Sequence, residues 1–146
     1  MTKVGIIGAG AAGLCAARHI KKISSVSSIK IFESQNSVGG TWIYTDSTNT
    51  PSSMYKSLVT NLPDRCMQFP DYDFHTLQNK ARFVGHEEVL NYLKGYCKKF
   101  SIEEFIQFET RVERVYRKDD KWYVESKTKN GKVESDDFDK LMERVR

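Results

Sequence analysis

A strand, a glycine-rich turn and a helix follow one another at the amino terminus, and this order constrains the fold more than any other feature. Residues 4–7 are a short apolar run of the kind that buried parallel strands show. Glycine then recurs in the spacing Gly-x-Gly-x-x-Gly over residues 8–13. Residues 11–23 are rich in helix formers, and residues 29–32 form a second apolar run. Strand, helix and strand within about thirty residues predict a right-handed βαβ unit.

Each glycine of this turn has a physical reason in such a unit. Gly8 permits the tight turn, Gly10 lets the backbone approach a pyrophosphate, and Gly13 lets the helix pack closely on the strand. The helix start offers unpaired N–H groups to phosphates. Glu33 ends the second strand twenty residues beyond Gly13, where a carboxylate accepts hydrogen bonds from ribose hydroxyls and disfavours a 2′-phosphate. The pattern predicts a dinucleotide-binding site.

A second glycine pair, Gly39-Gly40, follows the acidic strand and precedes Thr41 and Trp42. It would let the backbone come close to a part of the ligand beyond the first ribose, which suits a longer, flavin-bearing dinucleotide. The alternative is an ordinary Gly-Gly loop in which Trp42 fills the core.

The remainder of the chain predicts an α/β fold with an appended antiparallel β-meander. Residues 54–60 are expected to be a short helix, residues 62–80 irregular, and residues 86–100 an amphipathic helix. Strands are expected at residues 111–117, 122–128 and 132–135. The first two are joined by Asp119-Asp120, and Asn130-Gly131 predicts a type I′ turn before the third.

Composition excludes several classes of protein. The net charge of +4 comes from scattered residues, which argues against a nucleic-acid partner. Cys15, Cys66 and Cys97 lack metal-site spacing, so no metal is expected, and reduced thiols are expected in a cytoplasmic protein. No apolar run reaches the roughly 18 residues of a transmembrane segment.

Other residues with chemical potential are expected to be structural. They are His19, expected to be exposed; His75 and His86, which are isolated; Cys15, expected to pack in the core; and Asp71 and Asp73, expected to be solvated.

Ordered blocks along nearly the whole chain resemble the flavin-containing monooxygenase family, most closely its insect-type members. The glycine turn and Glu33 are followed by Val-Gly-Gly-Thr-Trp at residues 38–42 and Ser-Met-Tyr-Lys-Ser-Leu-Val-Thr-Asn-Leu-Pro at residues 53–63. Phe-Pro at residues 69–70, the 86–100 helix and Thr-Arg-Val-Glu-Arg-Val at residues 110–115 come next, and the similarity continues to Phe138-Asp139.

The resemblance implies a Rossmann-like FAD-binding domain and a set of cofactor contacts. The FAD pyrophosphate would lie against Gly8, Ala9, Gly10, Ala11, Ala12 and Gly13, and the adenosine ribose would bind to Glu33. The flavin would lie beside Gly40, Thr41 and Trp42, and Thr60, Asn61 and Leu62 would lie between the isoalloxazine and the nicotinamide. The adenine would contact the backbone of Val112.

In such enzymes NADPH reduces FAD, O2 adds at flavin C4a, and the hydroperoxide oxygenates a soft nitrogen or sulfur nucleophile, an amine or a sulfide. Asn61 is the candidate catalytic residue, because a side-chain amide can donate to developing oxygen charge. From the residues alone, Asn61 is instead a helix C-cap or a turn residue before Pro63.

The end of the chain departs from the family pattern. The family continues Phe-Asp into an apolar strand that returns to the FAD sheet, whereas Glu143, Arg144 and Arg146 fit a buried strand poorly. We therefore expect the closing strand to be lost. The second Gly-x-Gly-x-x-Gly, for NADPH, is also absent. The fold is therefore expected to be incomplete, and the chain is expected to be a truncated form of a flavin monooxygenase that does not catalyse oxygenation by itself.

The expected organisation is a single FAD-binding domain. It comprises the βαβ fingerprint over residues 1–45, loops and a helix over residues 46–104, the meander over residues 105–137 and a divergent end over residues 138–146. A non-catalytic FAD-binding or interaction fragment is the alternative function. An FAD- or NAD-dependent reductase that shares only the fingerprint is a weaker one.

Overall fold

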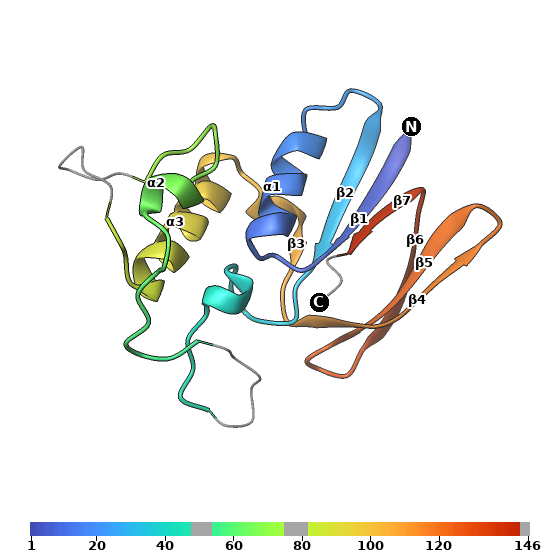
Figure 1. Ribbon diagram of the computed structural model, residues 1–146. Coiled ribbons are helices and arrows are strands. Elements are labelled where there is room, and N and C mark those ends of the chain that lie inside the picture. The colour runs from blue at the N-terminus through green and yellow to red at the C-terminus, as the bar shows by residue number, and fades with distance from the viewer. Residues whose placement is uncertain (48–53, 75–81, 144–146) are drawn as a thin grey trace.

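A computed structural model describes residues 1–47, 54–74 and 82–143 (Figure 1). Its centre is a parallel sheet with the strand order β3-β2-β1-β7. These strands are β1 (Thr2–Ile7), β2 (Val26–Phe32), β3 (Ile106–Gln107) and β7 (Lys140–Glu143). The predicted βαβ unit is confirmed, because α1 (Ala11–Ile20) connects β1 to β2 and these two strands pair in parallel.

Two helices cover one face of this sheet and form the main core with it. α1 packs against α3 (His86–Lys99), the predicted amphipathic helix (Figure 1). Val4 and Ile6 of β1 point to this face, since alternate strand residues share a side. The buried members of the core are Val4, Ile6, Ala9, Leu14, Ala17, Ile31, Val38, Tyr92, Leu93, Tyr96, Cys97 and Ile102.

The predicted antiparallel meander is also confirmed and lies against the opposite face (Figure 1). It consists of β4 (Thr110–Lys118), β5 (Lys121–Thr128) and β6 (Val133–Phe138), in that order. Phe32 of β2, Val124 and Phe138 form a second buried cluster between the sheets. Gly5 is essential to this contact, because a Cβ there would lie 2.8 Å from Leu141 Cδ1 and 2.9 Å from Phe138 Cδ2.

Both hairpins form, but the prediction of a type I′ turn at Asn130-Gly131 is wrong. Only Gly131 has a positive φ, +84°, and its N–H donates to the Thr128 carbonyl over 2.8 Å. Type I′ geometry requires positive φ at both central residues. It occurs instead between β4 and β5, where Asp119 and Asp120 have φ values of +48° and +62°.

The prediction of a short helix over residues 54–60 is also wrong. This segment contains a turn and an isolated antiparallel bridge between Val59 and Gly85. A four-residue helix, α2 (Asp64–Met67), begins only after Pro63. Pairing with the chain before α3 therefore prevails over local helix propensity, as tertiary contacts often do. Two 3₁₀ turns, η1 (Gly40–Trp42) and η2 (Glu103–Phe105), complete the elements.

The expected loss of the strand after Asp139 is wrong for residues 140–143. β7 pairs in parallel with β1, with Leu141 opposite Gly5. The charges are tolerated because β7 lies at the edge of the sheet, where Lys140 and Glu143 are exposed and Leu141 packs towards the meander. A strand at an edge does not bury its charged side chains as a central strand covered on both faces would. Arg144 and Arg146 lie outside the described residues.

Gly5→Ala tests the contact between the two sheets. The added methyl group overpacks against Leu141 and Phe138, so we expect the free energy of unfolding to fall by about 1–3 kcal/mol. Urea denaturation of the purified chain measures it. Leu141→Val frees part of that space, so the double variant should lose less stability than the two single variants together. Additive losses would contradict a steric origin.

Candidate functional site

The glycine turn and Glu33 lie side by side at the carboxyl edge of the parallel sheet. β1 ends at Ile7 and β2 at Phe32, and these two residues are paired. The N–H of Gly8 donates to the Phe32 carbonyl over 2.8 Å. Ligands of open α/β sheets bind outside the carboxyl ends of the strands, so both predicted elements occupy the expected edge.

The start of α1 is open to an anion. A Cβ on Gly13 would lie 2.0 Å from the Gly8 carbonyl oxygen, so only glycine lets the helix approach the turn this closely. Gly10 is the N-cap residue and, as a glycine, has no side chain that could cap the helix. The first turn contains no acidic residue. The first N–H groups of a helix have no partner within it. The amides of Ala11, Ala12 and Gly13 are therefore suited to a phosphate group.

Glu33 is a fixed part of this turn. Its side chain is buried, its Oε2 accepts a hydrogen bond from the Ala9 N–H at 2.7 Å, and its Oε1 accepts one from the Gln35 N–H at 2.8 Å. Oε1 also accepts a hydrogen bond from the Ser34 hydroxyl at 3.4 Å, so the further lone pair of this carboxylate is on Oε2. The ribose contact stays a prediction, while the structural role as an anchor for Ala9 was not visible in the sequence.

The second glycine loop touches the first. The Gly39 N–H donates to the Ala9 carbonyl over 3.1 Å, and a Cβ on Gly40 would lie 3.0 Å from the Gly10 Cα. Gly39 and Gly40 have φ values of +136° and +55°, which favour glycine. The loop therefore lies beside the start of α1, where a group bound to the helix amides would pass.

Thr41 and Trp42 continue this loop into η1. Thr41 is exposed. Trp42 is half-buried and packs against the main core, as the core-filling alternative requires. A role of its exposed part beside a flavin stays a prediction.

Val112 is brought close to Glu33 through the start of β4. The Thr110 N–H donates to the Glu33 carbonyl over 2.9 Å, and Val112 follows two residues later. The pairing of β4 with β5 shifts register between Val112 and Arg114, which marks a β-bulge. Bulges interrupt the ladder and are common beside ligand sites, so this geometry suits the predicted backbone contact. The buried Thr110 is a connecting residue that no sequence signal indicated.

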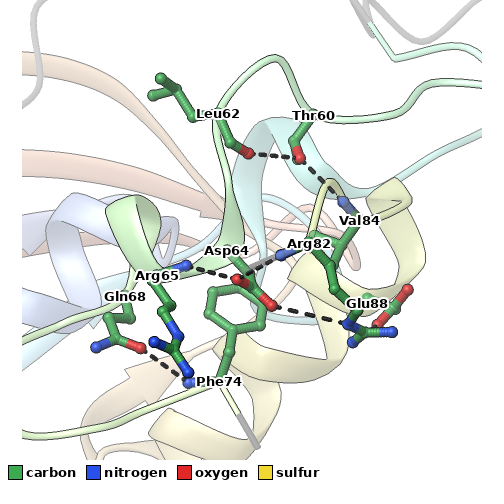
Figure 2. A network of polar contacts seen from close by, with 9 residues as sticks. All are labelled: Thr60, Leu62, Asp64, Arg65, Gln68, Phe74, Arg82, Val84 and Glu88. Carbon is green, nitrogen blue, oxygen red and sulfur yellow. Dashed lines mark hydrogen bonds and ion pairs between the residues drawn. The ribbon is translucent and has the colours of Figure 1, made fainter. Parts of the chain in front are cut away.

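The block at residues 60–62 is split between a buried and an exposed part (Figure 2). Thr60 is buried, and its hydroxyl donates to the Leu62 carbonyl at 2.8 Å and accepts from the Val84 N–H at 3.1 Å. Asn61 and Leu62 are exposed at the tip of the bend. The described residues 54–60 contain no helix, so the helix C-cap interpretation is wrong, and Asn61 lies in a bend before Pro63.

A chain of contacts connects this bend to the second glycine loop. Val59 bridges to Gly85, directly before α3. The ring of His86 lies 5.3 Å from the ring of Tyr44, which follows Trp42 by two residues. η1 also contacts α3. The Asn61 bend and the second glycine loop are therefore both attached to α3.

These features fit FAD. The two glycine loops approach one another where side chains would collide, the helix amides lack partners within the helix, and an anchored carboxylate stands at the end of β2. The arrangement can hold a pyrophosphate flanked by a ribose.

Most of the other residues singled out in the sequence are structural. His19 is exposed, as expected. His86 is buried and contacts the Lys56 carbonyl, and His75 lies outside the described residues. The expectation that Asp71 is solvated is wrong, because its Oδ2 accepts a hydrogen bond from Arg18 Nε at 3.1 Å; Asp73 is exposed. Burial, with a contribution from Asp71, raises the pKa of the Cys15 thiol, which suits packing rather than reactivity.

In residues 1–47, 54–74 and 82–143, no three His, Cys, Asp or Glu side chains group as a metal site. No helix in those ranges has the length and apolar character needed to cross a membrane.

Comparison with known proteins places these features in one family. The family model described as flavin-binding monooxygenase-like matches residues 1–144. The flavin-containing monooxygenase FMO GS-OX4 of Arabidopsis thaliana is 38% identical over an alignment 156 positions long. This alignment covers 95% of this chain and 33% of the relative. The placement in an insect-type subgroup stays a prediction.

Solved structures agree with the sequence relatives. The S-allyl-L-cysteine S-oxygenase from Allium sativum superposes with a TM-score of 0.86 at 40% identity, covering 97% of this chain and 36% of that structure. Tmm from Pelagibacter sp. strain HTCC7211 superposes with a TM-score of 0.85 at 35% identity, again over 97% and 36%. The chain thus spans about a third of the length of these proteins.

Two glycine substitutions in the same turn should differ sharply in their effect on stability. Gly13→Ala places a carbon 2.0 Å from the Gly8 carbonyl oxygen, so we expect a loss of about 3 kcal/mol or more. Gly10→Ala places one 3.5 Å from the Gly40 Cα, an ordinary contact, and should cost less than about 1 kcal/mol as a poorer N-cap. Urea denaturation compares them. Equal losses would show that the close approach at Gly13 does not hold α1 in place.

Proposed function

The chain belongs to the flavin-binding monooxygenase-like family, whose model matches it over residues 1–144, and we propose that it holds FAD as part of a flavin-dependent monooxygenase. The observation that carries this proposal is the contact between the two glycine loops at the open start of α1. A ligand that ends at its phosphate groups needs the first loop alone. The second loop provides close backbone approach further along the ligand.

Each part of the site has a role in holding the cofactor. The amides of Ala11, Ala12 and Gly13 bind the pyrophosphate, with the positive end of the α1 dipole behind them. Glu33 accepts a hydrogen bond from a ribose hydroxyl through the lone pair of Oε2 that Ala9 leaves free, since Gln35 and Ser34 both donate to Oε1. The backbone of Val112, beside the bulge in β4, contacts the adenine.

The chemistry itself belongs to the cofactor. Bound FAD would take a hydride from NADPH and activate O2 to oxygenate a soft nitrogen or sulfur atom. A sulfide is the substrate class that the S-oxygenase name of a 40% identical relative favours, and an amine is the second. Gly40, Thr41 and Trp42 would line the flavin, and Leu62 would lie between the isoalloxazine and the nicotinamide.

Asn61 is the residue of this chain that we assign to the oxygen chemistry. It is exposed at the tip of a bend, and its side-chain amide can donate a hydrogen bond where negative charge develops on oxygen. A preorganised donor of this kind needs a fixed backbone, which the hydrogen bonds of Thr60 to Leu62 and Val84 supply.

Cofactor binding can be tested on the chain as it is. The purified protein should retain FAD through desalting and prefer it to NAD and NADP. Gly10→Ala should weaken FAD binding by about tenfold or more, because the methyl group occupies the space where pyrophosphate meets backbone. Isothermal titration gives both affinities, and the unfolding curve of Gly10→Ala is the control for folding. Tight binding of NADP with no FAD retained would contradict the proposal.

The role of Asn61 is tested with a nearly isosteric change. Asn61→Asp removes the N–H donor at constant size, so FAD affinity should stay within about twofold while reduced flavin reacts with O2 to release hydrogen peroxide about tenfold faster or more. The bound FAD is reduced with dithionite and mixed with aerated buffer in a stopped-flow spectrometer. Asn61→Gln keeps the amide and serves as the control. Identical traces for Asn61→Asp and the wild type would remove Asn61 from the oxygen chemistry.

A further inference from the structure

The bend that carries Asn61 is held at its first end by a pair of hydrogen bonds from one residue. The Thr60 N–H donates to the Val84 carbonyl at 2.9 Å, and the Val84 N–H donates back to Thr60 Oγ1 at 3.1 Å. The side-chain hydroxyl thus takes the place that a backbone carbonyl has in a β-ladder. Because Oγ1 also donates to the Leu62 carbonyl at 2.8 Å, the same hydroxyl closes the bend (Figure 2).

The second end of the bend repeats this arrangement with Asp64. The Asp64 N–H donates to the Arg82 carbonyl at 2.8 Å, and the Arg82 N–H donates back to Asp64 Oδ1 at 3.1 Å. The Arg65 N–H donates to the same oxygen at 2.7 Å. Figure 2 shows the two clamps, at Thr60 and at Asp64, on either side of Leu62.

The clamp residues are buried, whereas the residues between them are exposed. Thr60 and Val84 are buried, and so is Asp64, which is 0% exposed. Asn61 and Leu62, between the clamps, are exposed. The backbone is hydrogen-bonded on both sides of Asn61, at Thr60 and at Asp64, which restricts the conformations that the Asn61 backbone can adopt.

The carboxylate of Asp64 is buried although it is not fully hydrogen-bonded, which is unusual for a purely structural residue. Its Oδ2 accepts no hydrogen bond from the described residues, although it is buried. The Nε of Arg82 lies 3.9 Å from it, and that guanidinium also pairs with Glu88 at 3.0 Å. Burial of an incompletely paired carboxylate is unfavourable, so the clamp at Asp64 lowers the stability of the folded chain.

We propose that Thr60 and Asp64 are positioning residues, which hold the Asn61 side chain in a fixed orientation towards the FAD site. This inference rests on the proposed function. Neither side chain needs to touch the cofactor, because both oxygens are engaged with the backbone of the bend and of the segment before α3. The gain is preorganisation, since a donor fixed in advance stabilises developing charge without reorganising.

The first measurement needs no cofactor. Thr60→Val removes the hydroxyl at constant shape, so the Val84 amide should exchange its hydrogen about fivefold to tenfold faster in the FAD-free chain. Thr60→Ser keeps the hydroxyl and should leave exchange at Val84 unchanged. Asp64→Ala should have the same effect on the Arg82 amide, and Asp64→Asn, which keeps an Oδ1 acceptor, should not. Hydrogen exchange followed by NMR resolves both amides.

The second measurement asks whether the clamps act through Asn61. In a double-mutant cycle, Thr60→Val is combined with Asn61→Asp, and the reaction of reduced, bound FAD with O2 is timed for all four proteins. If Thr60 positions Asn61, the effect of Asn61→Asp should shrink to about twofold or less once the clamp is broken. A purely structural Thr60 would leave that effect undiminished.

The outcomes separate the two proposals. Non-additive rates together with faster exchange at Val84 support the positioning role. Additive rates, or unchanged exchange at Val84 in Thr60→Val, overturn it while the proposed function stands. A wild-type chain that binds no FAD overturns the proposed function and the positioning role with it. Should Asp64→Ala fail to fold, the Thr60 cycle decides by itself.

Discussion

The approach of α1 to the turn after β1 is the contact on which the rest of the structure depends. A Cβ at Gly13 would lie 2.0 Å from the Gly8 carbonyl oxygen, so the helix reaches this depth only because a side chain is missing. The approach points the first amides of α1 at the carboxyl edge of the sheet. It also brings Ala9 to a position where its N–H meets Glu33 and its carbonyl meets Gly39. Because Gly13 has no side chain, the start of α1, Glu33 at the end of β2 and the second glycine loop can lie next to one another.

The sheet beneath this site is stabilised from both sides by residues that alternate along β1. Val4 and Ile6 pack under α1 and α3, whereas Gly5 faces the meander and makes room for Leu141 and Phe138. Phe138 meets Phe32 edge to face, with ring centroids 5.9 Å apart. The strands that carry the site at their carboxyl ends, β1 and β2, are therefore covered on both faces.

The flavin end of the candidate site depends on α3 rather than on the sheet. Gly39 lies so close to this helix that a Cβ would come 2.4 Å from Leu90 Cδ1, and the bend at Asn61 is bound to the segment directly before it. A shift of α3 would therefore move the second glycine loop and the Asn61 bend together. The two ends of a bound FAD would accordingly be held by separate elements, which share the main core through α1 and α3.

Local patterns in the sequence determined the βαβ unit, the α3 helix, the meander and the adjacency of Gly8–Gly13 with Glu33, because each follows from periodicity or from short, fixed spacing. The hairpin at Asn130-Gly131 was predictable, but its turn type was not, since Asp119-Asp120 took the type I′ geometry instead. Tertiary structure alone decided the rest. Residues 140–143 form a strand because an edge position exposes their charges. Thr60 and Asp64 became anchors because Val84 and Arg82, about twenty positions away, supply the opposing backbone. Unlike the glycine turn and Glu33, these pairs belong to no motif of fixed spacing.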